Sequence, residues 1–224
     1  MATIELSHIN KSFGHGTSQI DVLKDINFSA QKGELSLVLG PSGSGKSTFL
    51  TIAGGIQSPT SGSVQVEGTE LATLSAKQRD ALRLDHIGFI LQAYSLIPYL
   101  TVAEQFQLVD RIKPANNMNA TELDTLLDQL GISDLVKKYP SELSGGQTQR
   151  VAIARALYAN PDIVLADEPT AALDSDRVKV VGGLLHDLAK TQNKAIVVVT
   201  HDLRLQEFAD HSFEIMDGQM HEDN

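Results

Sequence analysis

The chain contains no cysteine among its 224 residues, which excludes disulfide bonds and thiolate chemistry. Basic residues are scarce as well: 18 Lys and Arg stand against 28 Asp and Glu, for a formal net charge of −10. No nucleic-acid partner is therefore expected, because contacts to a phosphate backbone need a basic surface. No apolar run approaches the roughly 18 residues of a membrane-spanning helix, and the opening MATIELSHINKSF lacks the apolar core of a secretion signal. Any role at a membrane would thus depend on a partner.

Short apolar segments alternate with helical ones along the chain. The runs HIGFIL, DIVLAD and AIVVVT are typical of central strands covered on both faces. The segments TIELSHI, VLKDINFSA and GSVQVEG predict further strands, and FEIMDGQMH predicts a hairpin. Helices are predicted in TVAEQFQLV, TELDTLLDQLG, RVAIARALYANP and, weakened by its two glycines, DRVKVVGGLLHDLAK. This order predicts one α/β domain over residues 1–224, with a mostly parallel core (1–92 and 158–224) and an inserted helical subdomain at about 93–157.

The segment GPSGSGKST matches the pattern G-x-x-x-x-G-K-[ST], in which glycines let backbone N–H groups surround phosphate oxygens. Lys46 would reach the β- and γ-phosphates of ATP, and the Ser47 hydroxyl would bind Mg²⁺. The alternative is a Gly/Ser turn with a surface lysine, but a strand before the motif and a helical run after it favour the phosphate loop. The predicted ATP-binding residues here are Gly40, Pro41, Ser42, Gly43, Ser44, Gly45, Lys46, Ser47 and Thr48.

Polar side chains follow three of the apolar strands. In an open parallel sheet such strand ends lie beside the glycine loop. Asp167 can hold the hydration shell of Mg²⁺, and Glu168 can polarise the attacking water as general base. His201 is predicted to face the γ-phosphate, and Gln92 to complete the magnesium shell; taken singly, either residue could equally be structural. The predicted catalytic residues are thus Glu168, His201, Lys46 and Gln92, and the predicted metal ligands are Ser47, Gln92 and Asp167.

A second glycine motif, LSGGQ, precedes a helical run about a hundred residues after the first. A glycine pair at a helix start is a common structural feature, but here it also offers amide groups to an anion. Because the motif lies in the predicted helical insertion, it cannot easily reach the ATP of its own chain. It can reach the ATP of a second copy placed head to tail. The residues predicted to act across such a dimer are Leu143, Ser144, Gly145, Gly146 and Gln147.

The ordered set GPSGSGKST, Gln92, LSGGQ, IVLADEP, ALD and THD resembles the ATP-binding-cassette (ABC) family along the whole chain. The resemblance implies a P-loop nucleotide-binding domain with an N-terminal antiparallel β part. It also implies that Phe13 stacks on adenine with Val22 beside it, and that Asp174 bridges the two protomers. Longer stretches, such as YPSELSGGQTQRVAIARAL, are similar to the macrolide- and lipoprotein-exporter type, a group that includes haem exporters, antimicrobial-peptide resistance pumps and cell-division ATPases.

Three positions depart from the common pattern of that type, namely Leu91, Thr148 and the pair Ala171-Ala172, and none of them removes a catalytic group. The expected function is an Mg²⁺-dependent ATPase that dimerises on ATP and drives a membrane permease from the cytoplasmic face, exporting a hydrophobic or amphiphilic substrate. A mechanotransmitting ATPase of the cell-division type is the main alternative. A soluble ATPase for ribosomes or DNA is disfavoured by the acidic, single-cassette chain, and an ATP-binding regulator without hydrolysis by the presence of Lys46, Glu168 and His201.

Overall fold

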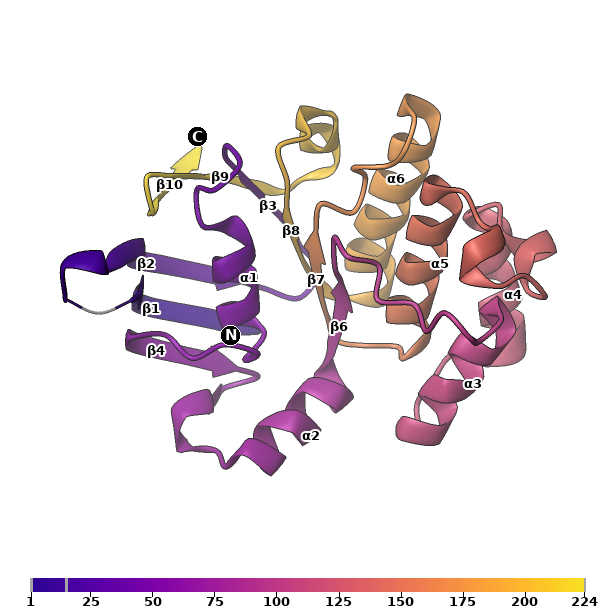
Figure 1. Cartoon of the computed structure of the whole chain (residues 1–224), viewed down its shortest axis with the longest axis horizontal. Helices are drawn as coiled ribbons and strands as arrows, with labels where there is room; N and C mark the ends of the chain where they lie inside the picture. Colours follow the sequence, from indigo (N-terminus) through magenta and orange to yellow (C-terminus); the bar gives the residue numbers. More distant parts are fainter. Residues whose placement is uncertain (1, 15, 224) are drawn as a thin grey trace.

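The computed structural model describes residues 2–14 and 16–223, and in this part of the chain the strands form two sheets (Figure 1). The first is antiparallel, in the order β2-β1-β4-β5. Alternate residues of β1, such as Ile4 and Leu6, are buried, as the half-buried strand pattern predicts. Its strands are β1 (Ile4–Phe13), β2 (Ile20–Ala30), β4 (Ser61–Val66) and β5 (Thr69–Glu70).

The second sheet has the order β10-β9-β3-β8-β7-β6, and all its neighbouring pairs are parallel except β9 and β10. Every residue of β7 and β8 is buried, which confirms the prediction that DIVLAD and AIVVVT are central strands covered on both faces. HIGFIL was predicted as a third central strand, but its strand β6 lies at the edge of the sheet, where it pairs with β7 alone among the described strands. The predicted hairpin near the end of the chain is also present. The strands are β3 (Leu35–Leu39), β6 (Ile87–Ile90), β7 (Ile163–Asp167), β8 (Ala195–Val199), β9 (His211–Met216) and β10 (Gln219–Asp223).

The predicted helices are present, and capping residues start most of them. Thr101 caps α3 through the predicted capping box with Glu104. Gly182 does not interrupt α6: the ring of Phe208 packs against its Cα, and a Cβ at this position would lie only 2.4 Å from that ring. The helices are α1 (Lys46–Ala53), α2 (Ala76–His86), α3 (Val102–Ile112), α4 (Ala120–Gln129), α5 (Gly145–Tyr158) and α6 (Ser175–Gln192).

Helix α2 was not predicted. It contains no fully buried residue, so the apolar periodicity that reveals other helices is weak here. The signal that could have found it is the Ser75 and Gln78 pair, which forms a complete capping box.

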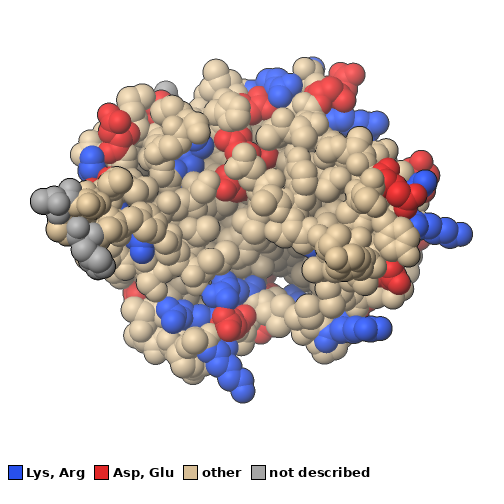
Figure 2. All heavy atoms as spheres, viewed as in Figure 1, with Lys and Arg blue, Asp and Glu red and all other residues tan. Residues whose placement is uncertain are grey.

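In Figure 2 basic side chains gather over α2 with an acidic one among them, and the rest of that face mixes both signs.

The parallel sheet separates two apolar cores. On β3 and β8, Leu37 and Val198 point into a core shared with α3, α4, α5 and α6, whereas Val38 and Val197 point into a core shared with α1 and the antiparallel sheet. Figure 1 shows the same division, with α5 and α6 on one side of β7 and β8 and α1 on the other. Helices α3, α4, α5 and α6 therefore pack on the sheet through one shared core. Within the described residues, no helix combines the length and apolarity needed to cross a membrane.

Candidate functional site

The carboxyl ends of β3, β6, β7 and β8 meet at one edge of the parallel sheet, as the strand order requires. The loop after β3, residues 40–45, leads into α1, and the other three strands end next to it. Together they enclose a cavity of about 290 Å³. It is lined by Ser42, Gly43, Gly45, Lys46, Ser47, Thr48, Gln92, Asp167, Glu168 and His201. The structure thus brings together the glycine loop and all the predicted catalytic and metal-binding side chains.

The loop before α1 has the properties of an anion site. Gly40, Gly43 and Gly45 have φ values of 150°, 83° and 105°, which other residues rarely adopt. Among the described residues, the backbone N–H groups of Gly43, Gly45, Lys46 and Ser47 have no acceptor, so they can donate to a ligand at the start of the helix. The hydroxyl of Ser44 is buried without a hydrogen-bond partner in the part of the chain that the structure describes. These groups fit the phosphates of a nucleotide.

Lys46 holds the loop in its curved shape. Its ammonium group donates to the carbonyl oxygens of Gly40 at 2.7 Å and Pro41 at 2.9 Å, and the side chain is 7% exposed. The charge therefore lies under the loop and beside the free amides. A phosphate bound there would meet the positive end of α1 and this ammonium group together.

Asp167, at the end of β7, lines the same cavity as Ser47 and Gln92. Burial raises the pKa of Asp167, and the charge of Glu168 adds to the rise, against a hydrogen bond from Ser47 and the charge of Lys46. One carboxylate with one hydroxyl and one amide is a donor set that suits Mg²⁺, which keeps several water and phosphate ligands. A bound Mg²⁺ would also offset the cost of burying this carboxylate.

Glu168 is held in an unusual position. Its φ is +49°, in the left-handed region that residues with a side chain seldom occupy. One carboxylate oxygen accepts from the Thr200 hydroxyl at 2.7 Å, and the other lies 2.8 Å from His201 Nδ1. With Glu168 ionised, Nδ1 carries the proton in this contact. Thr200 belongs to the THD motif, but nothing in the local sequence pattern assigns it a role.

A second cavity of about 520 Å³ lies on the other side of the glycine loop. Val22 contributes to its wall, together with Pro41 and the Asp217-Gly218 turn between β9 and β10. The sequence predicts this turn as a hairpin only, without a place near the nucleotide. In the part of the chain that the structure describes, Phe13 lines neither of these two cavities. Its exposed ring faces Lys11, whose Nζ lies 5.1 Å from the ring centroid.

The LSGGQ motif starts α5 and lies outside both cavity walls. Ser144 is the N-cap: its hydroxyl accepts from the Gln147 amide, and the Gln147 side chain accepts from the Ser144 amide. Gly145 is exposed, Gly146 is half-buried, and Leu143 packs against the core. Asp174 is the exposed N-cap of α6, where it accepts from the Arg177 amide. The structure therefore does not bring the LSGGQ residues to the glycine loop of their own chain.

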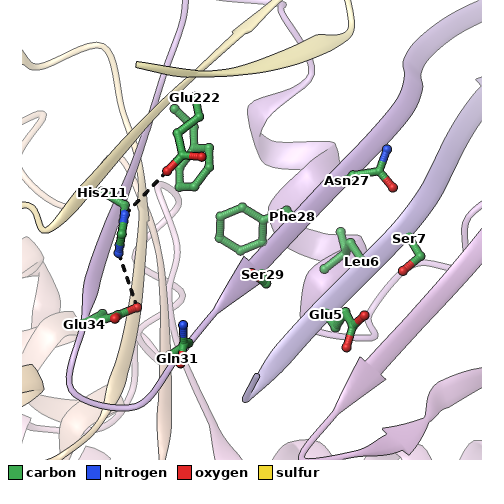
Figure 3. A pocket seen from close by; sticks show the side chains of 11 residues that line it. Glu5, Leu6, Ser7, Asn27, Phe28, Ser29, Gln31, Glu34, His211 and Glu222 are labelled. Carbon is green, nitrogen blue, oxygen red and sulfur yellow. Dashed lines mark ion pairs between the residues drawn. The ribbon is translucent and has the colours of Figure 1, made fainter. Parts of the chain in front are cut away.

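A third cavity, of about 420 Å³, lies at the opposite edge of the parallel sheet (Figure 3). His211, which begins β9, stands between Glu34 and Glu222, with nitrogen–oxygen distances of 3.6 and 3.5 Å. Because Glu34 precedes β3, this cavity is remote from the strand ends that carry Asp167 and His201. None of the predicted site residues lines it.

Comparison with known proteins gives the same family from sequence and from structure. Residues 23–171 match the model of the family described as "ABC transporter". A Staphylococcus haemolyticus protein named, provisionally, as a hemin import ATP-binding protein (HrtA) is 45% identical over 218 residues, covering 97% of this chain and 98% of that protein. The Staphylococcus aureus protein of the same name is 45% identical over 213 residues, covering 95% and 96%.

Two solved structures extend the comparison to assembly and reaction state. The dimeric structure of MJ0796, titled a bacterial ABC transporter cassette, has a TM-score of 0.91 and 37% identity, covering 99% of this chain and 98% of that one. A dimeric post-hydrolysis structure of MJ0796 bound to ADP and Pi has a TM-score of 0.89 and 37% identity, with the same coverage.

Proposed function

The chain belongs to the ABC transporter family and is an ATP-hydrolysing subunit of a transporter; from this premise we propose that it works as a homodimer on Mg²⁺-ATP, bound to a membrane permease at the cytoplasmic face. The observation that carries the proposal is the single cavity lined by Lys46, Asp167, Glu168 and His201. These side chains come from a helix and two strand ends that are far apart in sequence.

Each group has a chemical role that its position supports. The free amides of the loop and Lys46 bind the β- and γ-phosphates, and Ser47, Asp167 and Gln92 hold Mg²⁺, which would neutralise charge on the phosphates. Glu168 accepts a proton from the attacking water, and His201 orients the Glu168 carboxylate. Val22 and the Asp217-Gly218 turn border the space beside the glycine loop where the base and sugar fit.

The second glycine motif completes the site of a partner protomer. Ser144 and Gly145 lie at the positive end of α5, and they line neither of the two cavities beside the glycine loop of their own chain. In a head-to-tail dimer these groups would bind the γ-phosphate held by the other copy, and Asp174 would lie near the same interface. The MJ0796 structures, which are dimeric, support dimerisation of such a cassette.

The permease contacts the segment between β6 and α3. Its backbone is held from behind, because Arg155 of α5 donates to the carbonyl oxygens of Tyr94 and Ser95. Its side chains are partly presented to solvent: Tyr99 is 86% exposed and Ile97 is 40% exposed. Apolar groups on a fixed, exposed segment suit a helix of a membrane partner. Gln92, at the start of this segment, links it to the magnesium site.

The transported substrate is hemin or a similar amphiphilic molecule. The two Staphylococcus relatives support this substrate by name, and their names give import as the direction. The resemblance to exporter-type ATPases favours export. The two directions have opposite consequences for a host in which the gene is deleted. If the protein exports hemin, this host would become sensitive to hemin. If the protein imports hemin, this host would fail to use hemin iron.

Substitution of the general base tests the catalytic proposal. Glu168→Gln should retain ATP binding and lose nearly all turnover, because an amide of the same shape is a poor base. It should also accumulate as an ATP-bound dimer, measured by size-exclusion chromatography with and without ATP. Near-normal turnover would remove Glu168 from this role. Complementation of the gene deletion with this variant then separates transport driven by hydrolysis from other functions of the complex.

A further inference from the structure

Gln149, in the second turn of α5, is 1% exposed and contacts the backbone that follows the general base. Its side-chain nitrogen donates to the carbonyl oxygen of Glu168 at 2.9 Å, and its side-chain oxygen accepts from the Ala172 amide at 3.1 Å. One amide group therefore joins both ends of the turn formed by residues 168–172. The turn also has an internal bond, from the Ala171 amide to the Glu168 carbonyl oxygen at 3.3 Å.

This contact bears on the direction of the Glu168 carboxylate. With φ at +49°, Glu168 occupies a conformation that must be maintained by its surroundings. On its amino side, the Glu168 amide donates to the carbonyl oxygen of Val199 of β8 at 2.9 Å. On its carboxyl side, Gln149 is the side chain that fixes the peptide group. With its backbone held from both sides, the residue keeps its carboxylate directed at the cavity.

We propose that Gln149 is a positioning residue for ATP hydrolysis, which holds Glu168 in its active orientation by fixing the 168–172 turn. The proposal rests on the proposed role of Glu168 as general base. A buried amide that satisfies one donor and one acceptor of the same turn selects a single shape for that turn, which an apolar side chain of equal size cannot do. Gln149 does not line the cavity that holds Glu168 and Lys46, so its effect on the reaction passes through Glu168.

The position of Gln149 also joins the two glycine motifs. Gly146 lies in the first turn of the same helix, where a Cβ would be 3.0 Å from the Ala172 carbonyl oxygen. Ser144 caps this helix. In a head-to-tail dimer Ser144 serves the partner's ATP, whereas Glu168 serves the ATP of its own chain. Gln149 therefore connects the contact made at one ATP to the base that acts on the other.

The test compares two near-isosteric variants with a matched control in the full-length subunit. Gln149→Glu replaces the donor to Glu168 by an oxygen atom, and Gln149→Met removes both hydrogen bonds. The control is Gln105→Met, because Gln105 is also fully buried and its side chain bonds to backbone groups, those of Ile97 and Leu100. Both Gln149 variants should lower kcat by about tenfold to a hundredfold, the cost of misplacing a catalytic group by about 1 Å.

The split between kinetic constants identifies a positioning role. KM for ATP and ATP affinity should stay close to wild type in the Gln149 variants. Gln105→Met should keep the wild-type kcat, even if its melting temperature falls as much as those of the Gln149 variants. Wild-type kcat in both Gln149 variants would overturn the proposal. So would a fall in kcat that accompanies a loss of ATP affinity and matches the Gln105 control, because this indicates a general structural role.

Two further measurements remove the remaining ambiguity. Glu168→Gln is assayed in parallel: if it retains turnover, the proposed general base fails, and the Gln149 proposal fails with it. If neither Gln149 variant yields folded protein, hydrogen exchange in the wild-type subunit decides. Slow exchange of the Ala172 amide supports the contact with Gln149, and exchange at the rate of an open loop overturns it.

Discussion

His201 Nδ1 lies 2.8 Å from a carboxylate oxygen of Glu168, but the two side chains differ sharply in exposure, with 70% of His201 and 10% of Glu168 accessible. The histidine thus covers the carboxylate from the open side of the cavity. The Thr200 hydroxyl binds the other oxygen from the buried side. The two donors together fix the plane of the carboxylate.

Replacement of His201 by alanine should therefore lower turnover by about a hundredfold, the cost of misplacing a catalytic group by about 1 Å. ATP binding should persist, because the loop amides and Lys46 are untouched. Steady-state hydrolysis and nucleotide affinity measure the two effects. His211→Ala, at the remote cavity, is the matched control and should hydrolyse ATP normally. Loss of ATP affinity in His201→Ala, with turnover at saturating ATP unchanged, would contradict this role.

Mixed dimers test whether the second glycine motif acts across the interface. One chain carries Lys46→Ala and the other Ser144→Arg, so that in a head-to-tail dimer both defects fall in the same composite site. The other site is intact, and the dimer should retain hydrolysis. If both changes are placed on one chain and the partner is wild type, each site contains one defect and hydrolysis should be lost.

A motif that acted within its own chain would give the reverse result. The mixed dimer with one defect on each chain would then be inactive, and the dimer with one wild-type chain would be active. Affinity tags of two kinds allow each heterodimer to be purified before its ATPase activity is measured. The two arrangements carry the same substitutions, so differences in protein quality do not explain an opposite outcome.

Tyr158 gives a prediction for alkaline pH. Burial and the hydrogen bonds from its hydroxyl to Asp110 raise the pKa of Tyr158 to about 12. The unfolded-state pKa is about 10, so the stabilisation is fully present below pH 10 and is lost as pH rises to about 12. Tyr158→Phe should be less stable than wild type near neutral pH, by about 1.5 to 3 kcal/mol for a hydrogen bond to a charged group.

The free energies of unfolding of the two proteins should converge between about pH 10 and 12, as measured by denaturant titration at each pH. Comparison of the pair cancels the titration of lysines and of the other tyrosines. Tyr139→Phe, at a side chain that is 45% exposed, provides the control and should show no such convergence. A constant difference between wild type and Tyr158→Phe up to about pH 12 would refute the assigned cause.

Tyr99 tests the permease contact. Because this side chain is 86% exposed, Tyr99→Asp should leave the melting temperature and the ATPase activity of the isolated subunit unchanged. It should weaken co-purification of the permease, since a charge replaces an apolar contact. Leu96 is a poorer choice, because it packs against the core and its change to Asp should destabilise the fold. Val180→Asp, at an exposed position of α6, is the control; equal co-purification of Tyr99→Asp and this control would exclude the segment as the contact.

Most of the fold could be predicted because its elements carry local signals. Buried parallel strands such as Ala195–Val199 are uninterrupted apolar runs, and the capping box of Thr101 and Glu104 marks the start of α3. Helix α2 lacks a buried face, and its capping residues Ser75 and Gln78 are the one strong local signal. The strand ends also determine the site, because parallel strands bring Asp167, Gln92 and His201 to one edge of the sheet.

The contacts that organise the site were less accessible from sequence. Gln149 and Thr200 form hydrogen bonds with Glu168 although they are 19 and 32 residues away from it in sequence. Nothing in the type of either residue predicts such a contact. Family resemblance predicted Val22 to lie beside the residue that stacks on adenine, and in the structure Val22 lines the cavity next to the glycine loop. The role assigned to Phe13 stays a prediction, since its ring contacts Lys11 and lines neither cavity among the described residues.

The apolar core that helices α3, α4 and α5 share with the sheet restricts how these helices can move. Phe106 of α3, Leu126 of α4 and Val151 of α5 belong to one apolar cluster with Leu37 and Val164 of the sheet. Lifting the helices off would expose this cluster to water at about 2.5 kcal/mol for each 100 Å² of apolar surface. A displacement that keeps this cluster out of water is a shear, in which packed side chains slide by small steps while the contact stays closed. A consequence is that residues 93–157, expressed alone, would lose the wall against which they pack and would not keep a fixed structure.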